Sequence, residues 1–198
     1  MEPGVFRCRP GLQARCAMNI IATSIPSVLI FEPVVHEDSR GFFMETFREE
    51  EFRRVTGCTR PFVQDNHSRS ARNVLRGLHC QVRQPQGKLV RVVAGEIFDV
   101  AVDLRRSSPT FGRWVGEYLS SDNKRQMWIP EGFAHGFLVT SEVAETVYKA
   151  TDYYAPQHER TLLWNDAALG IEWPLTGAPI LTPKDAAGMP LAACEVFS

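Results

Sequence analysis

Short apolar runs of alternating hydrophobicity, separated by clusters of Gly, Pro, Asn and Ser, make up most of this chain. Between residues 97 and 104, Phe98, Val100, Val102 and Leu104 fall on one face of an extended chain, and Asp99 and Asp103 fall on the other. Similar runs cover residues 28–33, 41–47, 114–119, 133–139 and 143–151. Only residues 48–56 have clear helical spacing, with a second short helix expected over residues 185–191. Many evenly spaced strands favour a β-sandwich or barrel over alternating strands and helices.

The N-terminal residues differ from the rest of the chain. Three arginines among residues 1–15 precede a short apolar stretch, which loosely imitates a secretion signal. Polar residues and Pro26 interrupt that stretch, so we expect residues 1–17 to be a disordered leader or to lie upstream of a true start at Met18. A single domain is expected over residues 18–198. No run approaches the roughly 18 apolar residues of a membrane span, so no membrane partner is expected.

Charge and cysteine usage exclude several classes of protein. The 198 residues contain 22 Lys and Arg against 23 Asp and Glu, a net charge of -1, which gives no electrostatic basis for nucleic-acid binding. The five cysteines are odd in number and form no C-x-x-C pair. This pattern indicates free thiols in a reducing compartment, and we expect a cytoplasmic protein.

A histidine on the polar face of an apolar strand is the main chemical signal. Along residues 78–82, Leu78 and Cys80 share one face, and His79 and Gln81 share the other. Lys88 begins the next strand after a tight bend. A base that titrates near neutral pH beside a fixed positive charge suits proton abstraction next to a carbonyl. Cys80 points away from that face, which favours a small core residue over a nucleophile.

The other candidate residues have plain structural explanations as well. His135 lies on an aromatic strand face, where it is either a satisfied core or lining histidine or a functional one. An isolated strand tyrosine such as Tyr148 usually serves packing. Arg40, Arg76 and Lys88 are either solvated surface charges or anion contacts. Because Arg76 and Lys88 flank the histidine strand, they could hold two phosphates.

The sequence contains no metal or cofactor motif. A His-x-His chelate on a strand would need a second histidine at Gln81, and the other histidines are isolated. There is no phosphate-binding glycine loop, no G-x-G-x-x-G and no G-x-S-x-G. We therefore expect no metal and no cofactor, which argues against nucleotide-dependent oxidoreduction and serine hydrolysis.

Several ordered motifs closely resemble one family, dTDP-4-dehydrorhamnose 3,5-epimerase. The likeness runs from about residue 18 to about residue 185 and rests on Arg40–Phe43, Gln64–Ser68, Leu75–His79, Gly87–Arg91, Trp128–Leu138 and Asp152–Tyr154. The resemblance implies an all-β fold, a jelly-roll (cupin-type) barrel with short peripheral helices and no metal. It also implies a homodimer that exchanges N-terminal strands and acts on a dTDP-sugar.

The family inverts C3 and C5 of dTDP-4-dehydro-6-deoxy-D-glucose to give dTDP-4-dehydro-L-rhamnose, in dTDP-rhamnose biosynthesis. By resemblance, His79 is the base, Asp185 orients it, Lys88 stabilises the enolate and Tyr148 is the acid. The neighbouring tyrosines leave the identity of the acid open. The positions implied to contact substrate are Arg40, Glu45, Gln64, Asp65, Asn66, Arg76, His135, Tyr154, Glu159 and Lys184. The residue after the key histidine is commonly aromatic in the family and is Cys80 here, for which we expect repacking without altered chemistry.

Three other functions remain open at this point. A mono-epimerase acting on C3 or C5 of another dTDP-deoxysugar would show the same residues, so only its product would distinguish it. A non-catalytic cupin that binds a nucleotide sugar would not need the full acid–base set. A metal-dependent cupin oxygenase would need a chelate that the sequence lacks.

Overall fold

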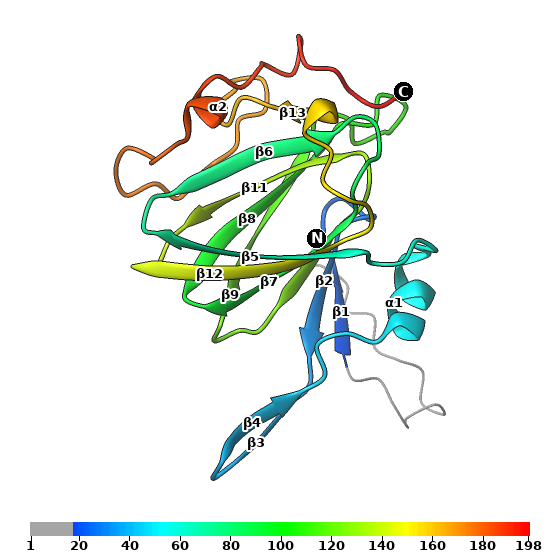
Figure 1. The fold of residues 1–198 in the computed structure, drawn as a ribbon, viewed down its shortest axis with the longest axis vertical. Coiled ribbons are helices and arrows are strands. Elements are labelled where there is room, and N and C mark those ends of the chain that lie inside the picture. Colours follow the sequence, from blue (N-terminus) through cyan, green and yellow to red (C-terminus); the bar gives the residue numbers. More distant parts are fainter. Residues whose placement is uncertain (1–17) are drawn as a thin grey trace.

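The computed structural model describes residues 18–198 as two facing antiparallel β-sheets with a projecting hairpin (Figure 1). The leader expected over residues 1–17 lies outside the described residues. The larger sheet contains, in spatial order, β1 (Met18–Ala22), β2 (Leu29–Pro33), β10 (Gln126–Ile129), β7 (Lys88–Ala94), β12 (Val143–Ala150) and β5 (Gln64–Ala71). The smaller sheet contains β13 (Glu159–Thr161), β6 (Leu75–Gln81), β11 (Phe133–Val139), β8 (Glu96–Asp103) and β9 (Trp114–Ser120). This arrangement confirms the predicted all-β jelly roll.

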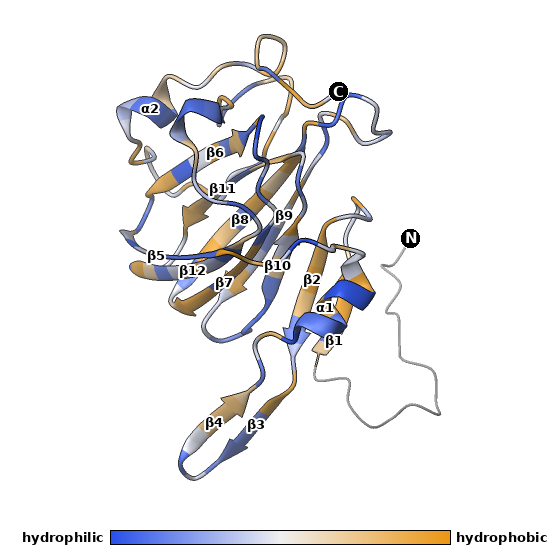
Figure 2. Cartoon of the chain, turned by 45° about the vertical axis from the view of Figure 1, so that its right-hand side comes forward, coloured by the Kyte–Doolittle hydropathy of each residue, from blue (hydrophilic) through white to orange (hydrophobic). Residues whose placement is uncertain are grey.

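Apolar residues fill the space between the sheets and also lie on part of each outer face. The inner core includes Val90 and Met127 from the larger sheet and Ile97, Ala101 and Phe137 from the smaller one. The even-numbered residues of β8 lie on its other side, under the C-terminal segment, where Leu162 and Cys194 cover them. Both faces of β8 are therefore buried, and β2 and β8 are largely hydrophobic in Figure 2. The alternation predicted for residues 97–104 is confirmed.

Helix α1 (Glu49–Thr56) packs on the part of the outer face of the larger sheet that carries Leu89 and Trp128. Its Phe52 packs edge-on against Trp128, with ring centroids 4.9 Å apart, and Gly57 ends the helix in the left-handed conformation. The other helical segments are short: a 3₁₀ turn at Pro156–His158 and α2 (Pro183–Ala186). None of the helices between residues 18 and 198 is long and apolar enough to cross a membrane.

Two predicted elements have different bounds in the structure. The strand expected over residues 41–47 ends at Met44, because β4 (Gly41–Met44) pairs only with β3 (Val35–Asp38) in a two-stranded arm. The helix expected over residues 185–191 was wrong: α2 begins earlier, since Thr182 caps it and Pro183 occupies its first position.

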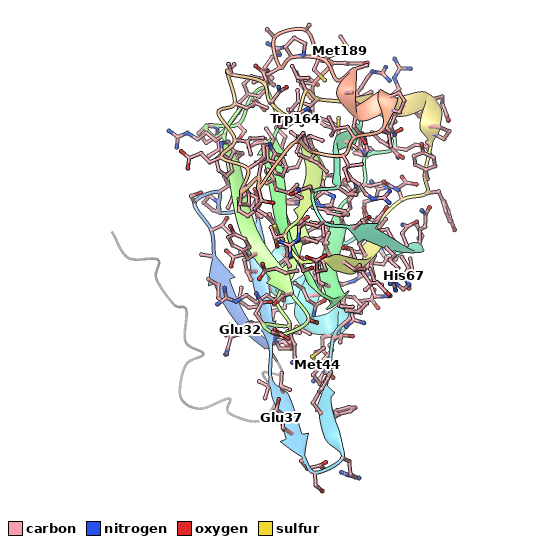
Figure 3. All side chains as sticks on the ribbon, turned by 90° about the vertical axis from the view of Figure 1, so that its left-hand side faces the viewer. Glu32, Glu37, Met44, His67, Trp164 and Met189 are labelled. Carbon is pink, nitrogen blue, oxygen red and sulfur yellow. The ribbon has the colours of Figure 1, made fainter. Side chains whose placement is uncertain are left out.

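The arm extends away from the two sheets. Glu37 and Met44 mark the arm at one end of the molecule, and Trp164 and Met189 mark the loops at the other end (Figure 3). Phe42 and Phe43 at its tip are 59% and 72% exposed. Such exposure of two aromatic side chains is unusual on a surface that contacts only water.

Candidate active site

Two glycines bring strands β6 and β11 into close contact near the predicted histidine. A Cβ atom at Gly77 would lie 2.6 Å from the His135 carbonyl oxygen, and Gly77 has a φ of +109°, which favours glycine. A Cβ atom at Gly136 would lie equally close to the Arg76 carbonyl oxygen, at 2.6 Å. The resulting register pairs His79 directly with His135.

A cavity of about 210 Å³ lies between the sheets at this point. The smaller sheet contributes His79, and the larger sheet contributes Lys88 and Tyr148 from the opposite wall. The full lining consists of Ser68, Arg76, His79, Lys88, His135, Gly136, Phe137, Tyr148, Thr182, Lys184 and Asp185. All four residues predicted to be catalytic therefore line one cavity.

His79 is held by a carboxylate that lies 106 positions further along the chain. Its Nε2 atom is 2.5 Å from Oδ1 of Asp185, which is 2% exposed, and Thr182 Oγ1 donates to the other carboxylate oxygen at 2.7 Å. Burial alone would raise the pKa of Asp185, but the hydrogen bonds from His79 and Thr182 keep it below its ordinary value. An ionised carboxylate only accepts, so Nε2 carries the hydrogen and Nδ1 is the nitrogen left to act as a base.

Burial shifts the two groups on the opposite wall. It lowers the pKa of Lys88, partly offset by the charges of nearby acidic groups. It raises the pKa of Tyr148, which keeps the phenol protonated at neutral pH although Arg76 has the opposite effect. A neutral phenol can donate a proton, and a buried ammonium can stabilise an oxyanion.

A second histidine–aspartate pair lies beside the first. His135 Nε2 is 2.7 Å from Oδ1 of Asp99, and both side chains are buried. Burial lowers the pKa of His135, against the raising effect of Asp99, so this imidazole is neutral. Asp99 was not predicted as a site residue. The signal was present, because Asp99 stands between apolar residues along a strand that is otherwise hydrophobic, and a buried carboxylate must have a partner.

A third group of polar residues adjoins Lys184, one of the residues that line the cavity. Glu159 Oε2 accepts from Lys184 Nζ at 2.9 Å and from the Tyr154 hydroxyl at 3.1 Å. Its other oxygen, Oε1, is 3.9 Å from His79 Nδ1. Burial would raise the pKa of Glu159, but Lys184 and His79 lower it below its ordinary value.

The remaining predicted contacts lie at different distances from the cavity. Arg76 lines it and donates to Ser70 Oγ at 2.9 Å. Gln64 donates to Asn66 Oδ1 at 2.9 Å and accepts from the backbone of Tyr154, so both lie on the β5 face that carries Ser68.

Three predicted residues are not brought to this cavity by their own chain. Asp65 points to the outer face of its sheet and pairs with Lys149 at 3.1 Å. Arg40 lies on the arm with its side chain 87% exposed, and Glu45 pairs with Arg48 near the base of the arm at 2.6 Å.

The two residues that follow His79 on its strand serve packing and backbone hydrogen bonding. Cys80 is buried in the core beneath the C-terminal segment, which raises the pKa of its thiol to about 12 and confirms the predicted core position. Gln81 shares the strand face of His79 as predicted, but its amide is buried and bonds the backbone of Gln84 and Ala155. Between residues 18 and 198, no three His, Cys, Asp or Glu side chains are grouped to hold a metal ion.

Comparison with known proteins identifies relatives over nearly the whole chain. The family model described as dTDP-4-dehydrorhamnose 3,5-epimerase matches residues 22–193. The dTDP-4-dehydrorhamnose 3,5-epimerase of Pseudomonas aeruginosa is 60% identical over 180 residues, which cover 91% of this chain and 99% of that protein.

Two solved structures are similar to this chain in both fold and sequence. The dTDP-6-deoxy-D-glucose-3,5-epimerase of Legionella pneumophila, in complex with dTDP-4-keto-L-rhamnose, has a TM-score of 0.88 and 54% identity, covering 90% of this chain and 95% of that one. A 3′-monoepimerase from Streptomyces bikiniensis in complex with dTDP-quinovose has a TM-score of 0.81 and 36% identity, covering 86% of this chain and 87% of that one.

Proposed function

The chain belongs to the dTDP-4-dehydrorhamnose 3,5-epimerase family, and we propose that it inverts C3 and C5 of dTDP-4-dehydro-6-deoxy-D-glucose in dTDP-rhamnose biosynthesis. The product is dTDP-4-dehydro-L-rhamnose. The observation that supports this most directly is the placement of a carboxylate-held imidazole on one wall of the cavity, with a protonated phenol and the amine of Lys88 on the other. Inversion requires a base and an acid on opposite faces of the sugar.

In the proposed mechanism, His79 Nδ1 removes the proton from the carbon next to the 4-keto group. The electron pair left on that carbon delocalises onto the ketone oxygen, where Lys88 stabilises the negative charge. Tyr148 then protonates the same carbon from the opposite face, and the ketone re-forms. The ketone acidifies both C3 and C5, so one cation near its oxygen serves both inversions.

The substrate contacts are proposed in two groups. Arg76, His135 and Lys184 line the cavity. Gln64 and Asn66 share a strand face with Ser68 of the lining, and Tyr154 and Glu159 are linked by hydrogen bonds to Lys184. Arg76 is the only one of these able to bind a phosphate through two parallel hydrogen bonds. Asp65 faces away and is the weakest member of the predicted set.

We also propose that the protein is a cytoplasmic homodimer. The exposed aromatic tip of the arm needs a partner surface, and the strand exchange expected from the family resemblance would supply one. Arg40, which does not reach its own cavity, would then contact the substrate of the partner subunit. Light scattering of the purified protein measures its molar mass, which should be that of two chains. In Phe43→Asp we expect the mass of a single chain, because the charge would prevent the arm from binding its partner.

The test of the reaction is proton exchange in deuterated water with dTDP-4-dehydro-6-deoxy-D-glucose. Deuterium at both C3 and C5, with the product trapped by a reductase as the rhamno-configured sugar, is the expected result. Label at only one carbon would mean a mono-epimerase, a function that the structural similarity to the 3′-monoepimerase keeps as the second candidate. Binding of the nucleotide sugar without any exchange would leave a non-catalytic binding protein and contradict the proposal.

A further inference from the structure

Glu159 lies where a proton could leave His79 for the solvent. Strand β13 pairs with β6, which places Thr161 opposite His79 and Glu159 opposite Gln81. Glu159 Oε1 is 3.9 Å from Nδ1, the nitrogen that is free to act as a base. A side-chain movement of about 1 Å, or one bridging water, would complete a hydrogen bond between them.

The proposed reaction leaves the site in the wrong protonation state after each inversion. His79 has gained a proton from the sugar carbon, and Tyr148 has lost one. A second inversion on the same sugar needs both groups restored, so protons must be exchanged with water between the two steps. The rate of that exchange limits turnover if no group connects His79 to solvent.

Asp185 cannot provide this connection. One of its oxygens is occupied by His79 Nε2 and the other by the Thr182 hydroxyl, and the side chain is almost inaccessible to water. Glu159 is differently placed, because its second oxygen bonds Lys184 and Tyr154, whose side chains are both about half exposed. Of the two carboxylates beside His79, only Glu159, on the Nδ1 side, therefore has partners that are open to bulk water.

We propose that Glu159 is a proton relay that returns His79 to its neutral form between the two inversions. The proton moves from Nδ1 to Glu159 Oε1 and from there to a water molecule at the Tyr154–Lys184 surface, while solvent reprotonates the Tyr148 phenolate. Lys184 keeps the carboxylate ionised and ready to accept. This inference rests on the proposed epimerase function, and it gives Glu159 a task distinct from holding the substrate.

The test compares wild-type protein with Glu159→Gln in deuterated water. With the relay intact, the proton on His79 exchanges during the lifetime of the enolate, so substrate recovered before completion carries deuterium. In Glu159→Gln we expect the original hydrogen to return to the sugar. Deuterium in the recovered substrate then falls about tenfold, and kcat falls by about the same factor.

Two further variants separate a relay from a purely structural role. Glu159→Ala leaves space for a small carboxylate, so formate should restore kcat in proportion to its concentration. Glu195→Gln is the control. It removes the ion pair of 2.5 Å between Glu195 and Arg160, the residue next to Glu159 in β13, and it should leave both kcat and the labelling unchanged.

The outcomes are distinguishable from failure of the epimerase function itself. If wild-type protein exchanges no carbon-bound hydrogen, the proposed function fails before the relay is tested. If wild-type protein epimerises but Glu159→Gln labels its substrate as fast as wild type, with no formate effect in Glu159→Ala, the relay is refuted.

Discussion

Replacing Asp185 with Asn tests the acid–base assignment most directly. In the structure, Thr182 Oγ1 donates to one oxygen of Asp185, and His79 Nε2–H donates to the other. An asparagine has one accepting oxygen and no charge. With that oxygen on the Thr182 hydroxyl, its NH₂ group faces Nε2; with the amide turned the other way, His79 keeps a hydrogen bond but loses the charged partner. In the first orientation the NH₂ group only donates, which forces the imidazole hydrogen onto Nδ1 and removes the proposed base.

The size of the effect follows from two contributions. Loss of a hydrogen bond to a charged group costs about 1.5–3 kcal/mol, equivalent to a factor of about 10 to 150 in rate. Loss of a correctly placed general base costs about 10²–10⁴ in rate, and the two losses overlap because they concern the same interaction. We therefore expect kcat of Asp185→Asn to fall by about 10² to 10⁴, while KM changes little.

The assay is steady-state epimerisation coupled to reduction of the product, with circular dichroism to confirm folding. Asp166→Asn is the matched control. It also alters a buried carboxylate in the C-terminal part of the chain. Asp166 accepts a hydrogen bond from the backbone N–H of Leu191 at 2.7 Å, and it is not among the residues that line the cavity. This control should lose stability without losing kcat. A folded Asp185→Asn protein that keeps kcat within about threefold of wild type would refute the assignment of His79 as the oriented base.

Three other variants test separate parts of the structure. Lys88→Met should slow deuterium exchange at C3 and at C5 together, by about 10²–10³, and loss of exchange at only one carbon would contradict the shared oxyanion. Asp103 is buried, and although burial alone would raise its pKa, hydrogen bonds from Arg105 and two hydroxyls lower it from 3.8 to about 2. Because the folded pKa lies below the unfolded one, this carboxylate stabilises the protein above about pH 4 and loses that effect as the pH falls toward about 2. Urea titration should show about 2 kcal/mol less stability for Asp103→Asn at pH 7, with the difference from wild type shrinking by pH 3. Gly77→Ala should lower both stability and kcat in the same assays, because its Cβ would meet the His135 backbone at 2.6 Å; wild-type values would show that the two strands can separate at no cost.

Local patterning explains why much of the fold was predictable. Successive side chains on a strand point to opposite faces, so the alternation at residues 78–80 already placed Cys80 in the core and His79 on the other side. The helix at α1 followed from its spacing and ended at Gly57 as a left-handed cap. The arm was missed because two paired strands exposed to solvent have the same local pattern as strands within a sheet.

Partners across the cavity could not be read from such patterns. The sequence identified His79, Lys88 and Tyr148 as candidate groups, and the family resemblance added Asp185 and Glu159. That His79 Nε2 meets Asp185 while Nδ1 faces Glu159 depends on how α2 and β13 lie against β6. The pairing of Asp99 with His135 depends likewise on which strands are neighbours in the smaller sheet.

The sequence by itself determined the strands, the face on which each side chain lies and the chemical groups available for catalysis, because these follow from the geometry of a few consecutive residues. Only the tertiary structure decided which of those groups meet and how deeply each is buried. Such contacts join residues as far apart as His79 and Asp185, and they exist only once sheet order and loop closure have brought distant segments together.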